Sequence, residues 1–364
     1  MDFTPSEAQQ AIQELCRDIL SDLVTDPSLV ALEEDGGGMH GEAWEQLGAS
    51  ELLSVALPEA AGGAGVDWLA IGSLLVEVGR AVAPIPALDT LAVAGPLIGA
   101  LASESQQAAM LEGVGAGAVI AVAAEEPGSR DPRHPTSRLV FEGQGLRLDG
   151  EKTAVAFAAQ ATRFVVPAVL DGRVRLAVVP AAASGVQLEA QQGTNGIPMG
   201  RVRFEGVRLE ADDLLVDDPD AASLLVDCMR LGQVAVLTGV AERALELSAE
   251  YCRTRKQFGQ PIGTFQAVSQ RLADAYIHVE SMRATLWQAA WRMGEGRSAR
   301  REIGIARYIA AEGAHFVVCA AQHVHGGMGF DRDYPLHRYF LWCKQHEFAL
   351  GGSQAMLAEL GARD

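Results

Sequence analysis

Cysteine is scarce in this chain of 364 residues, and no two cysteines have the spacing of metal ligands. The five thiols are odd in number and lie far apart in the sequence, at Cys16, Cys228, Cys252, Cys319 and Cys343. This pattern argues against a cysteine-rich zinc site and against a disulfide framework. It indicates reduced thiols in a cytoplasmic protein.

Basic residues are in deficit as well. The chain has 29 lysines and arginines against 47 aspartates and glutamates, which gives a formal net charge of -18. A nucleic-acid partner requires a basic face that neutralises phosphates, and an anionic membrane surface attracts basic clusters in the same way. The composition therefore argues against both kinds of partner.

Uninterrupted apolar runs and a targeting segment are also missing. The most hydrophobic stretch, residues 81–102, is interrupted by Pro84, Pro86, Asp89 and Pro96, so it does not predict a membrane span. Residues 1–7 contain no basic segment followed by an apolar one, so no signal peptide is expected.

What the sequence does contain is a periodicity that changes from helical to strand-like and back. A chain of this length is expected to form two or three domains. The first third has apolar residues at helical spacing, with Ser6 placed to cap the first helix. Short apolar runs follow, and helical spacing then returns. We predict an N-terminal helical domain over residues 1–116, a middle β domain over 117–217 and a C-terminal helical domain over 218–364.

The middle segment predicts a small antiparallel barrel or sandwich, because short strands follow one another with no helix between them. Asp171-Gly172 between two apolar runs is typical of a hairpin turn. In the last third, Thr264, Ser298 and Pro335 stand where three helices would begin. Long antiparallel helices with short loops indicate a four-helix bundle, so the predicted fold class is α+β.

The most specific motif lies between two of these helices. It spans residues 253–266 and reads R-T-R-K-Q-F-G-Q-P-I-G-T-F-Q. It resembles the R-x-x-F-G-x-x-(I/L)-x-x-F-Q signature of the acyl-CoA dehydrogenase family, and the helix–sheet–helix order extends this resemblance over nearly the whole chain. The resemblance implies an N-terminal helical domain, a middle β-barrel or sandwich and a C-terminal four-helix bundle.

The resemblance also assigns part of a cofactor site to this motif. In the family, the arginine at position 255 pairs with the pyrophosphate of an FAD held mainly by the neighbouring subunit, a task that suits a guanidinium with its bidentate donors. The signature continues through Gln257, Phe258, Phe265 and Gln266. Taken alone, Arg255 could equally be a cation favoured by the end of a helix.

A second motif ends the third long helix. The family has Q-x-x-G-G-x-G, and this chain has Gln322 and His323 followed by Gly326 and Gly327. Counting back from the glycines puts His323 at the family's glutamine, which contacts the adenosine end of the shared FAD; Gln322 is one residue early. An imidazole can also hydrogen-bond a ribose or phosphate oxygen. The glycines are equally typical of a helix C-cap, and no third ligand supports a metal site.

The residues that would hold a flavin ring in this chain match the family less well. Its T-E-P-G-x-G-S-D pattern becomes E-E-P-G-S-R-D at residues 125–131, and its N-G-x-K-x-W-I-T becomes D-G-E-K-T-A-V-A at residues 149–156. Ala154 stands in place of the tryptophan that covers the ring, and Ala156 in place of a hydroxyl donor. The resemblance therefore implies that this chain holds no flavin ring of its own.

The family's catalytic base is missing from its two known positions. Dehydrogenation of an acyl-CoA needs a carboxylate beside the α-carbon of the substrate. The family's E-G-T-S-Q reads L-G-G-S-Q from Leu350 onward, and the minority position of the glutamate is Met229. Asp227 and Glu347 lie near these positions, but their spacing places them on other helix faces.

This combination resembles the companion subunit of heteromeric α2β2 acyl-CoA dehydrogenases, which are associated with CoA thioesters of sterol side chains. We expect a cytoplasmic subunit that shares FAD with a catalytic partner. The partner would bind the acyl-CoA, and an electron-transfer flavoprotein or similar carrier would accept the electrons. Two alternatives stay open: a scaffold or regulatory homologue without flavin, and a homotetrameric acyl-CoA dehydrogenase that uses an unusual carboxylate such as Asp227.

Overall fold

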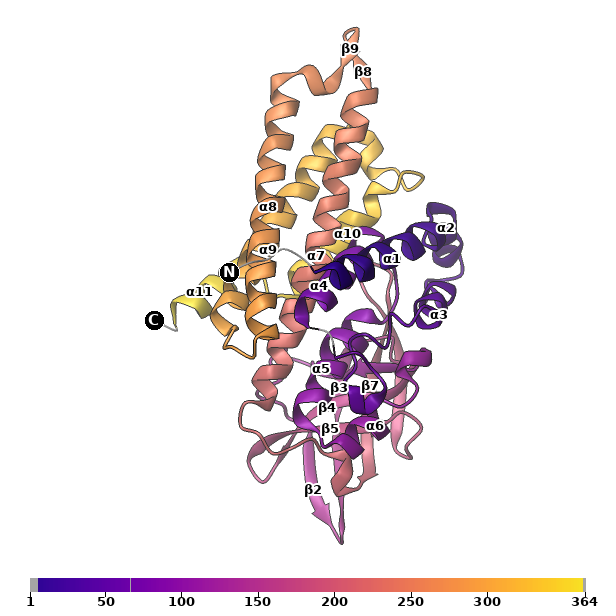
Figure 1. Cartoon of the computed structure of the whole chain (residues 1–364), viewed down its shortest axis with the longest axis vertical. Helices are drawn as coiled ribbons and strands as arrows, with labels where there is room; N and C mark the ends of the chain where they lie inside the picture. Colours follow the sequence, from indigo (N-terminus) through magenta and orange to yellow (C-terminus); the bar gives the residue numbers. More distant parts are fainter. Residues whose placement is uncertain (1–5, 66, 363–364) are drawn as a thin grey trace. The chain divides into compact units, whose positions relative to one another are not determined.

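The computed structural model describes residues 6–65 and 67–362 of the chain (Figure 1). The first five residues, on which the expectation of no signal peptide partly rests, lie outside the described residues. The chain separates into two compact units. The helical unit consists of Met1–Leu29, Trp68–Ala83 and Arg230–Asp364, and the sheet unit of Val30–Asp67 and Pro84–Met229. The division into three domains that the sequence suggests stays a prediction.

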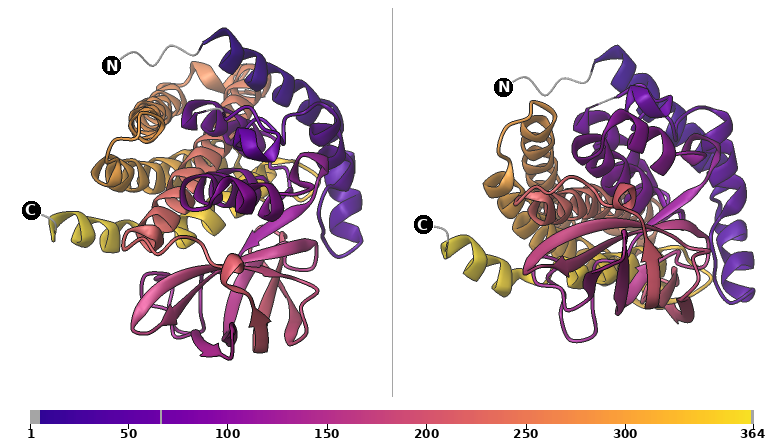
Figure 2. Two further views of the ribbon diagram at one scale, coloured as in Figure 1. Left: turned by 60° about the horizontal axis from the view of Figure 1, so that its bottom comes forward. Right: turned by 90° about the horizontal axis from the view of Figure 1, so that it is seen from below.

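The sheet unit is built around seven strands. They are β1 (Val119–Val122), β2 (Arg138–Glu142), β3 (Gly145–Ala156), β4 (Ala161–Leu170), β5 (Arg173–Pro180), β6 (Val186–Gln192) and β7 (Pro198–Leu209). Their order is β1-β4-β2-β3-β7-β6, with β5 added to β4. β1 and β2 pair with β4 in parallel and the other neighbours are antiparallel, so the curled sheet is mixed (Figure 2). With the helices, it confirms the α+β class, but the two parallel pairings correct the predicted antiparallel arrangement of the strands.

The predicted hairpin turn lies between β4 and β5. Asp171 and Gly172 have φ values of +49° and +80°, the left-handed conformations that a two-residue hairpin turn of this twist needs. The core beneath the strands is centred on Phe164 and Phe204, whose rings meet edge to face with centroids 6.2 Å apart. The core of the sheet unit is therefore apolar and closely packed.

Short helical segments complete the sheet unit, and two helices have residues in both units. The segments are α3 (Gly41–Ala49), η1 (Glu59–Ala61), the π-helical η2 (Leu88–Ala94), α5 (Gly95–Leu101), α6 (Glu104–Met110), η3 (Val114–Ala116) and η4 (Ala211–Asp213). The two helices with residues in both units are α2 (Asp26–Glu34) and α7 (Ala221–Thr254).

Long helices form the helical unit. They are α1 (Glu7–Leu23), α4 (Trp68–Arg80), most of α7, α8 (Gln266–Gly294), α9 (Arg300–His325), α10 (Leu336–Ala349) and α11 (Ser353–Gly361). The apolar windows of α7 and α9 are long enough to cross a membrane, but 72% and 61% of those windows are buried. Burial of this extent is what the core helices of a bundle require.

The starts of these helices test the predicted caps. Ser6 caps α1 with a complete capping box, and Pro335 directly precedes α10, so both predictions are confirmed. The predictions for Thr264 and Ser298 were wrong. The hydroxyl of Thr264 donates to the Pro261 carbonyl in a 3-10 turn, η5 (Ile262–Thr264), and α8 begins only at Gln266. α9 begins at Arg300, one residue too late for a cap at Ser298.

Candidate functional site

The Arg255 motif folds as a tight hairpin at the tip of the α7–α8 pair (Figure 1). Two-residue strands, β8 (Lys256–Gln257) and β9 (Gln260–Pro261), pair across it. The amide of Ile262 donates to the carbonyl of Arg255 at 2.9 Å, which closes the hairpin at its base. Phe258 and Gly259 form the turn with φ values of +52° and +81°. The turn thus keeps a phenylalanine in a conformation that L-residues seldom adopt.

The side chains of this hairpin face away from the helical unit. Arg255, Gln257 and Gln266 are exposed, and Phe258 is 94% exposed. The ring of Phe258 meets Phe265 edge to face, with centroids 6.1 Å apart. A phenylalanine held in solvent by a turn of unfavourable φ is typical of a surface that another molecule covers.

The second motif lies where α9 ends. His325 is the last residue of the helix, and Gly326 leaves it with a φ of +59°. A Cβ at Gly326 or Gly327 would meet no atom of the described chain within 4 Å, so the backbone here is open to a ligand. His323 is exposed, whereas Gln322 points inward and packs against Gly329.

An aromatic cluster that the sequence reasoning missed brings the two motifs together. The ring of Tyr251, one helical turn before Arg255, stacks on His325 with centroids 4.3 Å apart. His325 donates from Nδ1 to the carbonyl of Ala321 at 2.8 Å, so its Nε2 accepts from the Tyr334 hydroxyl at 3.0 Å. Burial lowers the pKa of His325, although the bond to Ala321 opposes this. The only sequence signal for this link was the aromatic residue one turn before Arg255.

These residues fit the dinucleotide end of a flavin cofactor. The guanidinium of Arg255 is exposed and is paired with no carboxylate of the described residues, so it is available to a pyrophosphate. The open glycine backbone after α9 suits close approach of the same group. The buried Oε1 of Gln322 has no hydrogen-bond partner in the described part of the chain, which is a feature of sites that are completed by a ligand or water.

The sheet unit does not offer the same fit to a flavin ring. Ala154 lies at a bulge in β3 with a φ of +53°, and its amide donates to Oε1 of Gln191 at 2.9 Å. Gln191 also accepts from the hydroxyl of Thr153 at 3.2 Å. Ala154 and Ala156, both in β3, present a methyl group where a stacking or hydrogen-bonding side chain would be needed. That this chain holds no flavin ring of its own stays a prediction.

The same part of the sheet unit contains a buried ion pair, between Lys152 of β3 and Glu126, that the sequence analysis did not single out. Nζ of Lys152 lies 2.8 Å from Oε1 of Glu126 and donates to the carbonyl of Pro167 at 2.8 Å. Glu126 also accepts the amides and hydroxyls of Thr136 and Ser137. Burial opposes the charged carboxylate, but these bonds outweigh it and hold the pKa of Glu126 at about 2. The sequence signal for this pair was that Glu126 and Lys152 match the family's patterns at residues 125–131 and 149–156, where neighbouring positions do not.

Leu350, which the resemblance places at the family's principal base position, is buried. Leu350 is 2% exposed, and its carbonyl accepts from Nε of Arg307 at 2.6 Å. Arg307 also pairs with Glu359 of α11 at 2.6 Å, and Arg230 binds the same carboxylate through two bonds of 3.1 Å. Burial would raise the pKa of Glu359, but the hydrogen bond from Arg307 and the charge of Arg230 lower it to about 2. Such a carboxylate stays ionised and is a poor proton acceptor.

The other carboxylates near these positions lie elsewhere. Glu347, three residues before Leu350, is half-buried and accepts from Lys344 at 2.7 Å. Asp227 and Met229 are both half-buried in α7. Leu350 thus lies beside Arg307. Asp227, the predicted alternative base, lies two residues before Met229 on α7.

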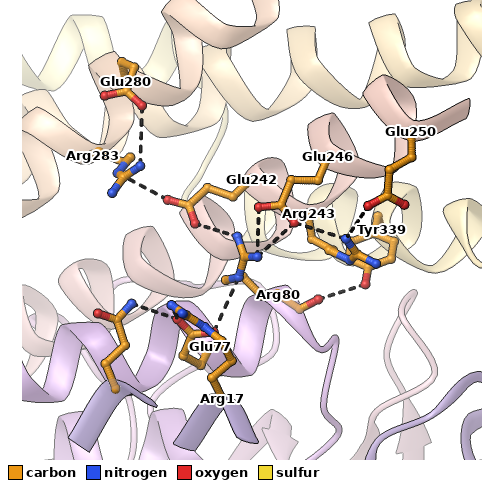
Figure 3. Close-up of polar contacts among 11 residues, drawn as sticks. Arg17, Glu77, Arg80, Glu242, Arg243, Glu246, Glu250, Glu280, Arg283 and Tyr339 are labelled. Carbon is orange, nitrogen blue, oxygen red and sulfur yellow. Dashed lines mark hydrogen bonds and ion pairs between the residues drawn. The ribbon is translucent and has the colours of Figure 1, made fainter. Parts of the chain in front are cut away.

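A polar cleft of about 820 Å³ lies between α1, α4, α7 and α8 (Figure 3). Its arginines are paired with glutamates. Arg17 lies 2.8 Å from the buried Glu77, Arg80 lies 3.0 Å from Glu242, and Arg283 lies 3.5 Å from Glu242. Because these charged side chains pair with one another, we interpret them as a network that holds the four helices together.

Comparison with known families agrees with this geometry. A model described as the N-terminal domain of acyl-CoA dehydrogenase matches residues 6–118. A model described as the C-terminal domain of acyl-CoA dehydrogenase matches residues 220–363, which include both motifs. Together the two models match well over half of the chain.

Individual relatives cover nearly the full length. Acyl-CoA dehydrogenase FadE27 of Mycobacterium tuberculosis is 37% identical over 99% of this chain and 98% of its own. A chain of the ChsE4-ChsE5 complex from the same organism has a TM-score of 0.92 at 36% identity, and covers 100% of this chain and 98% of that one. A chain of a variant of the Tcur3481-Tcur3483 steroid ACAD has a TM-score of 0.90 at 39% identity, with 98% and 97% covered. This protein therefore belongs to the acyl-CoA dehydrogenase family.

Proposed function

We propose that this chain is the companion subunit of a heteromeric, FAD-dependent acyl-CoA dehydrogenase. Acyl-CoA dehydrogenases are FAD-dependent oxidoreductases. In the proposed assembly the chain contributes its hairpin tip and the end of α9 to an FAD whose ring is held by the partner. The partner supplies the catalytic carboxylate and binds the acyl-CoA. FAD, when bound, supplies the acceptor for the hydride that leaves the acyl thioester.

The observation that carries this proposal is the exposed hairpin beside the end of α9. Arg255 would bind the pyrophosphate, and the glycine backbone at Gly326 and Gly327 would allow it to approach closely. His323, on the exposed side of α9, would contact the adenosine end, and Gln322 would align that turn from within. Phe258, exposed in the isolated chain, would be covered by the partner. These residues suit a cofactor that is held mainly by a neighbour.

The sheet unit and the Leu350 region support the division of labour. Ala154 and Ala156 would give a flavin ring neither a stacking surface nor a hydroxyl. Leu350 would give a substrate no proton acceptor, and Glu359 is held by two arginines. Chance losses would not be expected to spare the neighbour-facing groups and remove the others.

The names of the two solved relatives point in the same direction. One belongs to a complex of two differently named components, and the other pairs two components under the description steroid ACAD. By analogy, we propose a CoA thioester of a sterol or steroid side chain as the substrate class. An electron-transfer flavoprotein or similar carrier is proposed as the acceptor.

The test is co-expression with a candidate catalytic partner, an acyl-CoA dehydrogenase chain that carries a glutamate at the position of Leu350 or of Met229. The complex should contain one FAD for every two chains, whereas the chain expressed alone should show little absorbance near 450 nm. Within an active complex, Asp227→Asn should leave turnover largely unchanged, because the partner carries the base. A stable yellow homotetramer with one FAD per chain would overturn the proposal, and its inactivation by Asp227→Asn would identify the unusual-carboxylate enzyme instead.

A further inference from the structure

A cluster of reactive side chains lies between α9 and α10, outside the residues assigned to cofactor sharing. Its members are Cys319 and His315 on α9 and Lys344 and Glu347 on α10. Cys319 is the partly exposed thiol of this chain, whereas the other four cysteines are buried. Burial raises the pKa of each of those four thiols. Reaction with a solute is therefore expected to be confined to Cys319.

The imidazole of His315 connects the thiol to the charged pair on α10. His315 precedes Cys319 by one helical turn, and its Nε2 lies 3.8 Å from Sγ of Cys319. On its other side, Nδ1 contacts Nζ of Lys344 and lies 3.4 Å from Oε2 of Glu347. Lys344 and Glu347 are themselves 2.7 Å apart. Nucleophile, imidazole and orienting groups thus follow one another in hydrogen-bonding sequence.

This order of contacts fixes the role of each ring nitrogen. An ammonium group has only donors, so Lys344 donates to Nδ1 of His315 and to Oε2 of Glu347. The hydrogen of a neutral imidazole must then lie on Nε2, where it is directed at Sγ of Cys319. An N–H donor in this position can hydrogen-bond the sulfur anion that attacks a disulfide.

We propose that Cys319 is a modification site that forms a mixed disulfide with low-molecular-weight disulfides. The thiol of Cys319 first loses its proton to solvent, and the hydrogen on His315 Nε2 stabilises the resulting thiolate. Sγ attacks one sulfur of the reagent, whose S–S bond breaks as the new one forms. The leaving thiolate takes a proton from solvent. The reagent is reduced by the electrons that oxidise Cys319, so the exchange needs no further oxidant.

The test uses the full-length chain, in the assembly in which it is purified, exposed to 2-hydroxyethyl disulfide. Intact mass and peptide mapping should find one adduct, on Cys319, that dithiothreitol removes. Cys319→Ser should abolish it. His315→Leu, which removes the donor at an exposed position, should slow the reaction about tenfold. Lys344→Met should slow it by a smaller factor, because it removes the group that fixes the tautomer.

Glu312→Gln is the matched control, since Glu312 is exposed on α9 one turn before Phe316 and is outside the cluster. Its rate should equal that of the unaltered chain. Absence of an adduct at Cys319 would overturn the proposal, as would equal labelling of the buried cysteines. An unchanged rate in both His315→Leu and Lys344→Met would also overturn it, because the thiol would then react through exposure alone.

Discussion

At the scale of single residues, the chain distinguishes groups that face another molecule from groups that stabilise its own fold. Phe258 is exposed on a strained turn, although a phenylalanine usually packs, and Arg255 is exposed at the base of the same hairpin. Lys152 is the opposite case, because it is a fully buried ammonium paired within the sheet unit. Every bond of the Glu126–Lys152 pair is made within the sheet unit, which indicates that this pair serves the fold.

The Lys152 pair leads to a prediction about stability and pH. Lys152→Met leaves the Glu126 carboxylate buried without its ammonium, and should destabilise the chain by about 3–5 kcal/mol at pH 7. The folded pKa of Glu126 is about 2, below its ordinary value near 4.5. The stability from this carboxylate is therefore fully present above about pH 4.5 and is lost as the pH falls towards 2.

Thermal unfolding of the variant and the unaltered chain between pH 7 and pH 3 checks this prediction. The gap in Tm should be widest at neutral pH and should narrow below about pH 4.5. Lys256→Met, at an exposed lysine, is the control and should change stability by less than about 0.5 kcal/mol. A gap that stays constant over the whole range would show that packing of the lysine stem, and not the ion pair, is what matters.

At the scale of elements, helix packing in the helical unit depends on glycines that no local propensity reveals. A Cβ at Gly79 of α4 would lie 2.0 Å from the carbonyl oxygen of Val236, and a Cβ at Gly239 of α7 would lie 1.9 Å from that of Val76. The two helices therefore touch backbone to backbone at this crossing. Each helix carries a glycine at the place where the other approaches.

Gly239→Ala should accordingly force α4 and α7 apart. Alanine favours a helix by up to about 1 kcal/mol over glycine, but the clash with backbone atoms should cost more, for a net loss of about 1–3 kcal/mol. Gly99→Ala in α5 is the matched control, because its new methyl would make an ordinary contact of 3.7 Å with Pro58. A fall in Tm of several degrees is expected for Gly239→Ala alone, and equal behaviour of the two variants would contradict the crossing geometry.

Elements were predictable from the sequence where a local pattern decides them. Ser6 and Pro335 marked helix starts because their chemistry acts within one turn. Thr264 and Ser298 failed because a 3-10 turn and a longer loop delay the helices that follow. β6, at the edge of the sheet, has little local signal because its residues are largely exposed and its place depends on pairing with β7. The parallel pairing of β1 and β2 with β4 lay beyond any local signal for the same reason.

At the scale of the whole molecule, the sequence predicted the two motifs of the candidate site, but it did not predict that they lie close together. Arg255 and His323 are 68 positions apart, and the stack of Tyr251 on His325 joins their helix ends. The inward turn of Gln322 and the outward turn of His323 follow from helix phase once α9 is placed. The proposal that a second chain completes this site goes beyond what the contacts within this chain can specify.

Arg255→Ala tests the completed site in the complex with the partner. Loss of one charge-assisted contact to the pyrophosphate should cost about 1.5–3 kcal/mol, which corresponds to roughly 10- to 100-fold weaker retention of FAD. Arg255→Lys should recover only part of this, because an ammonium is a point charge and not a fork.

Arg253→Ala is the matched control, since Arg253 is exposed at the same helix end but outside the motif's cofactor contacts. The measurement is the recovery of FAD fluorescence on dilution, with Tm recorded in excess FAD to show that the fold is intact. Equal retention in the Arg255 and Arg253 variants would mean that Arg255 is only a cation at the end of α7, and that the cofactor is not shared across this surface.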